Sequence, residues 1–170
     1  NFKRAPGFFD MVTYDGTGAG ATHNHSLGVE PEMMIIKQRS STESWIVYHK
    51  ELYESLTGNF RLLTLNEDYD PNSNISRLNS TQPTSSVFSV GSDASTAGQT
   101  YITHLFASLS GISKVGTYTG TTNDLNVDCG FTAGARFILI KRTDASGDWY
   151  VWDSARGIGN GTDPYCLTNT

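Results

Sequence analysis

Two histidines and a short acidic stretch are the residues of this chain whose spacing could bind a metal ion. His23 and His25 are separated by one residue, so on an extended strand both imidazoles would lie on the same face. On the axis of a trimer, a ring of such pairs could hold a transition metal such as iron. Asp68, Asp70 and Asn72 have the oxygen-ligand spacing of a calcium loop, but the next Gly and the distal Glu of that loop are missing. A solvated strand and a polar loop explain the same residues, and we expect no cofactor.

An aromatic residue followed by a polar one occurs at two comparable places. Tyr48 and His49 form the first pair, and Trp152 and Asp153 form the second. An aromatic ring beside a polar group can stack on a sugar, so these four residues are candidate carbohydrate contacts. The same pattern is equally typical of the core and rim of a β-sandwich.

Catalytic motifs are absent from the sequence. There is no Gly-x-Ser-x-Gly elbow for a serine nucleophile. Asp148 and Asp153 lie too far apart along one strand to be assigned as the carboxylate pair of a glycosidase. We therefore expect that the chain is not an enzyme.

The elements that must position these residues are short strands. Apolar or alternating segments are separated by turns rich in Gly, Ser, Thr and Asn, a pattern typical of an antiparallel sandwich. A brief helix is expected within Lys50–Leu56, ended by Gly58, and a polar loop over Asp68–Gln82. The fold class expected is all-β, an antiparallel, jelly-roll-like sandwich, with first strands at residues 8–14, 23–27, 33–39, 44–49, 59–66, 86–90 and 100–109.

The sequence also repeats itself at an offset of 104 residues. Phe2–Thr17 resembles Phe106–Thr121, Ile36-Lys37 matches Ile140-Lys141, and Trp45-Ile46-Val47 matches Trp149-Tyr150-Val151. We expect two tandem units, residues 1–109 and a truncated copy at 110–170, whose matching segments superpose. By this alignment the chain starts and ends within strands, which predicts that it is a window of a longer protein.

Burial is predicted from the same strands. Trp45 and Val47 share one strand face, and we expect them and their counterparts Trp149 and Val151 to point into the core. The runs Met33–Ile36 and Phe137–Ile140 are apolar on both faces. Such strands are either covered on both sides or meet another subunit.

Composition excludes some partners. The formal charge is −5 without a basic cluster, which argues against nucleic acid. The longest apolar runs have about four residues, far fewer than a membrane helix needs, so we expect no membrane insertion. The two cysteines, Cys129 and Cys166, are too few for a disulfide framework; they are either buried free thiols or a single bridge.

Several phrases of the sequence resemble a repeat found in phage virion proteins. They are Tyr-x-Gly, an apolar strand ending Ile-Lys, Trp-x-Val, Val87–Gly91 and Tyr101–Phe106, and the most specific are Ala135–Thr143 and Gly147–Gly157. This repeat of uncharacterised function occurs in tailed phages of marine and cyanobacterial hosts, often in tail fibres or concanavalin-like jelly-roll proteins. Residues 2–109 resemble one full unit and 110–170 about two thirds of the next.

The resemblance implies a non-enzymatic structural component of the virion. We expect a tail fibre or appendage that helps attachment to the host surface, with other virion proteins, copies of itself and a host surface glycan as partners. A homotrimer is the oligomer expected of a fibre. A capsid decoration protein and an enzyme that degrades surface polysaccharide are the alternatives.

Overall fold

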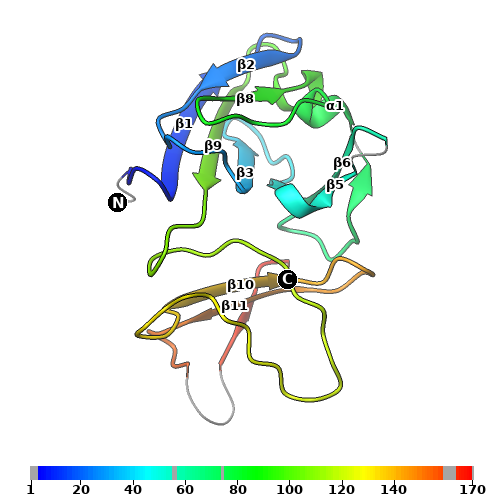
Figure 1. Cartoon of the computed structure of the whole chain (residues 1–170). Helices are drawn as coiled ribbons and strands as arrows, with labels where there is room; N and C mark the ends of the chain where they lie inside the picture. The colour runs from blue at the N-terminus through cyan, green and yellow to red at the C-terminus, as the bar shows by residue number, and fades with distance from the viewer. Residues whose placement is uncertain (1–3, 55–56, 74, 159–163, 170) are drawn as a thin grey trace.

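The computed structural model describes residues 4–54, 57–73, 75–158 and 164–169. Its sheets are antiparallel and its helical segments are single turns, so the chain is all-β, as the sequence predicts. Figure 1 shows a sandwich-like first unit above a smaller sheet. The strands are β1 (Phe9–Asp15), β2 (Ala21–Asn24), β3 (Met33–Gln38), β4 (Ile46–His49), β5 (Tyr53–Glu54), β6 (Asn59–Thr64), β7 (Asn72–Ser73), β8 (Val87–Val90), β9 (Thr100–Phe106), β10 (Phe137–Lys141), β11 (Trp149–Asp153) and β12 (Cys166–Leu167).

The main sheet of the first unit has the strand order β1-β9-β3-β4-β6-β5, with β7 added beside β6. The strand β9 is an interior strand next to the edge strand β1, because it pairs with β1 on one side and with β3 on the other, where Met33 faces Phe106. A separate two-stranded sheet, β2 and β8, forms the second layer. The long-range pairing of β9 is what closes the first unit.

One core lies between these layers. Strand alternation sends Met34 and Ile36 of β3 and Ile46 and Tyr48 of β4 to this inner side. The opposing layer supplies Leu27, Leu78, Phe88 and Val90. All of these side chains are buried, and removing their apolar surface from water is the main stabilising contribution.

The smaller sheet has the order β10-β11-β12 and reproduces the register of β3 and β4. Met33 pairs with His49 and Ile35 with Val47, and the counterparts 104 positions later pair in the same way. Local contacts agree: Lys37 Nζ donates to Glu43 O at 2.7 Å, and Lys141 Nζ donates to Gly147 O at 2.5 Å. The two strand pairs are built alike.

This likeness does not extend to residues 114–136. The sequence predicts a second β1 there, with Thr117–Gly120 matching Thr13–Gly16, but the described chain is irregular over this whole segment. Gly16 shows the difference, because a Cβ on it would lie 2.0 Å from Thr96 O, whereas Gly120 has open space. The expected superposition is therefore wrong for this segment, and a complete tandem repeat remains a prediction.

One face of the smaller sheet packs on the outer side of the main sheet, which is the side opposite to the core of the first unit. Trp149 is buried there with Val47 and Leu63, and Leu139 and Ile35 pack around them. The Trp149 indole N–H donates to Thr64 O at 2.9 Å, and Thr168 Oγ1 donates to Leu65 O at 2.6 Å. The strand β3 is thus covered on both faces within one chain, which is one of the two outcomes expected for it.

Three details of the expected fold are corrected. Trp45 does not enter a core but is 37% exposed, with Lys37 Nζ 6.0 Å from its ring centroid. Trp45 and Trp149 therefore occupy unlike environments.

The polar loop expected at Asp68–Gln82 contains β7 and a helical turn, α1 (Ile75–Leu78), because Leu78 is buried in the core. The helix expected at Lys50–Leu56 is a 3-10 turn over Lys50–Leu52, and residues 55–56 lie outside the described chain. The expected strand start at Asn1-Phe2 also lies outside it.

Candidate functional site

The four candidate carbohydrate contacts are not brought together. Tyr48 is 1% exposed and its ring packs edge-on against Phe60, so no sugar can reach it. Burial raises the pKa of its phenol. The candidate role of Tyr48 as a sugar contact is therefore wrong, and Tyr48 is a core residue.

His49 and Asp153 hold equivalent turns instead of presenting a site. Glu51 N donates to His49 Nδ1 at 3.3 Å, and Ala155 N donates to Asp153 Oδ1 at 3.0 Å. Backbone hydrogen bonds to its carboxylate, first of all from Arg156 N, lower the pKa of Asp153. Both residues are half-buried caps at the end of a strand, and a side chain committed to a cap is less free to bind a sugar.

The two histidines of the expected metal site are used by the first unit. His25 Nδ1 accepts from Leu27 N at 3.2 Å, so Nε2 carries the proton and donates to Thr84 O at 3.0 Å. Neither ring nitrogen of His25 is then free for a metal. His23 stacks on Tyr14 with ring centroids 4.0 Å apart, and its buried Nε2 has no hydrogen-bond partner among the described residues.

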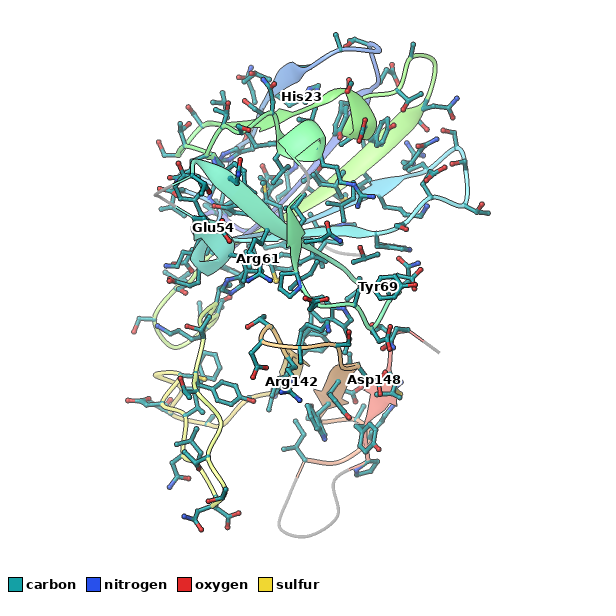
Figure 2. All side chains as sticks on the ribbon, turned by 90° about the vertical axis from the view of Figure 1, so that its right-hand side faces the viewer. His23, Glu54, Arg61, Tyr69, Arg142 and Asp148 are labelled. Carbon is teal, nitrogen blue, oxygen red and sulfur yellow. The ribbon has the colours of Figure 1, made fainter. Side chains whose placement is uncertain are left out.

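The acidic stretch lies elsewhere in the first unit. Figure 2 places His23 near the top and Tyr69, within that stretch, on the right at about mid-height. Asp68 accepts through its backbone carbonyl from Lys141 Nζ and Gly147 N, at 3.0 and 2.8 Å, and Asn72 pairs in β7 with Leu62. Within the described ranges, no three His, Cys, Asp or Glu side chains are grouped to hold a metal ion. Asp68 thus joins the smaller sheet to the first unit, whereas Asn72 belongs to the sheet of the first unit.

The cysteines do not pair. Cys129 and Cys166 are both free thiols and both half-buried. Of the two alternatives, the bridge is excluded in this structure, and full burial is not observed either. Cys129 borders a shallow hollow of about 350 Å³ that is also lined by Ser108, Lys114 and Asp128.

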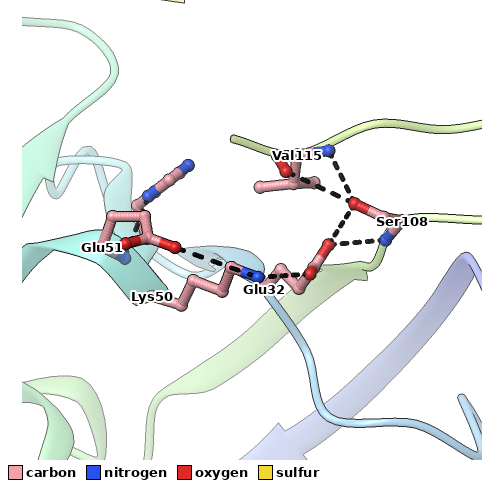
Figure 3. Close-up of polar contacts among 6 residues, drawn as sticks. Glu32, Lys50, Glu51, Ser108 and Val115 are labelled. Carbon is pink, nitrogen blue, oxygen red and sulfur yellow. Dashed lines mark hydrogen bonds and ion pairs between the residues drawn. The ribbon is translucent and has the colours of Figure 1, made fainter. Parts of the chain in front are cut away.

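A network around Glu32 fixes the chain where it leaves the first unit. Figure 3 shows Glu32 between Lys50 and Ser108. Its Oε1 accepts from Lys50 Nζ at 2.5 Å, and its Oε2 accepts from Ser108 N at 2.6 Å and from the Ser108 hydroxyl. Val115 N donates to Ser108 Oγ at 3.0 Å. Burial opposes ionisation of Glu32, but the hydrogen bonds from Lys50 and Ser108 outweigh it and lower its pKa.

A group of accessible aromatic rings lies on the smaller sheet, on the face turned away from the first unit. Tyr150 and Trp152 stack with centroids 5.6 Å apart, and Tyr165 contacts Tyr150 at 5.2 Å. Tyr165 is 54% exposed, while Tyr150 and Trp152 are half-buried. Of these rings only Trp152 was a candidate from the sequence. Because Tyr150 lies two residues before Trp152 in the same strand, strand alternation could have indicated that the two rings share a face. Tyr165 lies beside them because β12 pairs with β11, which the sequence did not predict.

The described residues form an all-β module with an accessible aromatic and apolar sheet face, and they contain no group of three His, Cys, Asp or Glu side chains that could hold a metal ion. Residues 4–170 match the model of a family described as a domain of unknown function, DUF7483, and the chain belongs to that family. No curated protein and no solved structure matches the chain. No helix in the described chain is long and apolar enough to cross a membrane.

Proposed function

We propose that the chain is a non-enzymatic structural module of a phage virion, a segment of a tail fibre or appendage that contributes to attachment at the host surface. The resemblance of Ala135–Thr143 and Gly147–Gly157 to a virion repeat supports this assignment. Its partners are then other virion proteins and further copies of itself, and a host glycan is the receptor class.

The observation that carries the proposal is that the β10–β11 strand pair packs on the β3–β4 pair, which has the same register. β10 and β11 place Trp149 on the outer face of β3, β4 and β6, and the buried cluster is supplemented by hydrogen bonds to Thr64 O, Leu65 O and Asp68 O. Apolar packing joined by several directional bonds holds successive segments in one orientation. A projecting appendage needs such fixed packing.

The hydrogen bonds of several titratable residues support a structural role. Asp10 illustrates this: its buried carboxylate accepts from Met11 N at 2.8 Å and Ser26 N at 2.6 Å, and Arg4 Nε lies 2.9 Å from it. A carboxylate with so many partners is committed to holding two segments together. His25 also bonds a distant segment through Thr84 O, and His49 and Asp153 are committed to local turns.

Labelling of intact particles tests the proposal. Gold-conjugated antibody raised against the 170-residue chain should mark the tail or an appendage of the phage that encodes it, with few copies per particle. Labelling over the whole capsid would favour a decoration protein. Unlabelled particles, or release of reducing sugar from host capsule by the purified chain, would contradict a structural role in the virion.

A further inference from the structure

β10 is an edge strand of the smaller sheet, and its outer edge has no neighbouring strand among the described residues. In the main sheet, β3 pairs with β4 on one side and with β9 on the other. β10, which has the register of β3, pairs with β11, and no other described strand lies along its second edge. An unpaired edge presents a row of backbone donors and acceptors that another strand can satisfy.

The side chains beside that edge correspond to core residues. Met34, Ile36, Ile46 and Tyr48 are all buried in the first unit, and their counterparts Ile138, Ile140, Tyr150 and Trp152 are half-buried. In the first unit these positions are covered by the second layer and by Tyr101 and Leu105 of β9. The aromatic face therefore has the composition of a core but only part of its cover.

The irregular segment at 114–136 points to the same missing neighbour. β1 has a single partner strand, which is β9, and the Tyr14 side chain of β1 stacks on Tyr101 of β9 with centroids 5.1 Å apart. Tyr118, the counterpart of Tyr14, is 50% exposed, whereas Tyr14 is 8% exposed. A segment of this kind forms a strand only when a strand like β9 lies beside it.

We propose that the free edge of β10 and the adjoining face of the β10–β12 sheet bind an extended peptide strand. The strand runs antiparallel to β10 and alternates buried and half-exposed residues as Thr100–Phe106 does, with Tyr101, Thr103 and Leu105 inward. Binding of this kind is β-augmentation, in which backbone hydrogen bonds give affinity and alternate side chains give specificity. A sugar would use the aromatic rings alone, and a second copy packed face to face would leave the edge unpaired.

A synthetic peptide with the sequence of Thr100–Ala107 tests the proposal on the 170-residue chain. At a peptide concentration of about ten times Kd, hydrogen exchange of the β10 amides should slow about tenfold. A control peptide that carries Tyr101→Asp and Leu105→Asp keeps the length and the outward residues but loses the inward apolar side chains, so it should not protect β10. No protection by the first peptide, or equal protection by both, would overturn the proposal.

Matched variants locate the site. Ile138→Lys places a charge on the binding face and should abolish protection, whereas Phe137→Lys changes a 61% exposed neighbour on the opposite face and should leave it intact. Unchanged circular dichroism of both variants checks that the sheet is formed. Loss of binding in both variants, a dimer that Ile138→Lys dissociates, or displacement of the peptide by a soluble host glycan would each contradict a strand as the occupant.

Discussion

The indole of Trp149 joins the two parts of the chain through two kinds of interaction. Its ring removes apolar surface of Val47 and Leu63 from water, and its N–H satisfies Thr64 O. Trp149 N also donates to Asn169 Oδ1 at 3.1 Å, so the residue is fixed from its backbone as well. Trp45 has the matching backbone bond to Asn66 Oδ1 at 2.9 Å, but its ring is exposed.

Replacement of Trp149 by Ala should destabilise the chain by about 3–5 kcal/mol, the usual cost of truncating a buried aromatic residue. Trp45→Ala is the matched control and should cost about 1 kcal/mol or less, which is the value of an exposed cation–π contact. Urea unfolding followed by circular dichroism measures both. Equal losses for the two variants would show that Trp149 does not hold the interface.

His23 is a histidine whose protonation the fold opposes. Its ring lies between Tyr14 and Phe88, with centroids 4.0 and 5.6 Å away, and burial lowers its pKa. His49 and His104 have lowered pKa values for the same main reason. When the folded pKa is the lower one, the unfolded chain binds more protons, and folding loses stability as the pH falls below the unfolded value.

We therefore expect the melting temperature to decrease as the pH falls below about 6.5, the ordinary pKa of histidine. His23→Phe keeps an aromatic ring in the stack but removes the titrating group, so its melting temperature should depend less on pH. Thermal melts of both proteins between neutral and acidic pH measure the difference. Parallel pH profiles would mean that His23 does not contribute.

At the scale of elements, Glu32 connects the start of β3 with the segment that follows β9. Glu32→Gln keeps the shape but loses the ion pair with Lys50 and one acceptor, and charge-assisted hydrogen bonds are worth about 1.5–3 kcal/mol each. The amides of Ser108 and Val115 should then exchange faster with solvent. Glu51→Gln, whose carboxylate lies 3.9 Å from Lys50 Nζ, is the control and should leave these amides unchanged. If the Ser108 and Val115 amides exchanged at an unaltered rate in both variants, Glu32 would not hold this segment in place.

The alternation within strands was readable from the sequence because burial follows the period of two residues. It predicted β3, β4, β6 and β9 within a few residues of their observed bounds. It predicted correctly that Val47 and Trp149 are buried, but it could not say that they are buried against each other, between the two sheets. It also could not show that Val115–Thr119, whose sequence resembles part of β1, is irregular in the structure.

The candidate sites were less predictable because short polar patterns have several uses. His23 and His25 do share a strand side, but one ring stacks on Tyr14 and the other bonds Thr84 O. His49 and Asp153 do occupy equivalent positions, as the sequence alignment predicted, but both side chains accept hydrogen bonds that cap a turn. The aromatic face around Tyr165 required the pairing of β12, which no local pattern specifies.

At the scale of the whole molecule, the surface retains apolar groups that favour association. Phe137 is 61% exposed and Ile112 is 58% exposed, and Leu125 and Val127 are about half exposed. The outermost strand β1 pairs with β9 alone among the described strands, so its other edge is open. Open edges and exposed apolar side chains are typical of surfaces that other chains cover.

We expect the native protein to be a homo-oligomer, and a homotrimer if it is a fibre. Linking several weak receptor sites can raise avidity by about 10²–10⁴ over a single site, which gives a fibre a reason to be multimeric. Light scattering of the full-length protein at micromolar concentration should give three times the monomer mass. Because the β10 edge is reserved for a strand, Ile138→Lys should leave this mass unchanged. A monomer at every concentration tested would exclude the trimer and the fibre, and would leave independent binding modules joined in one chain as the better account.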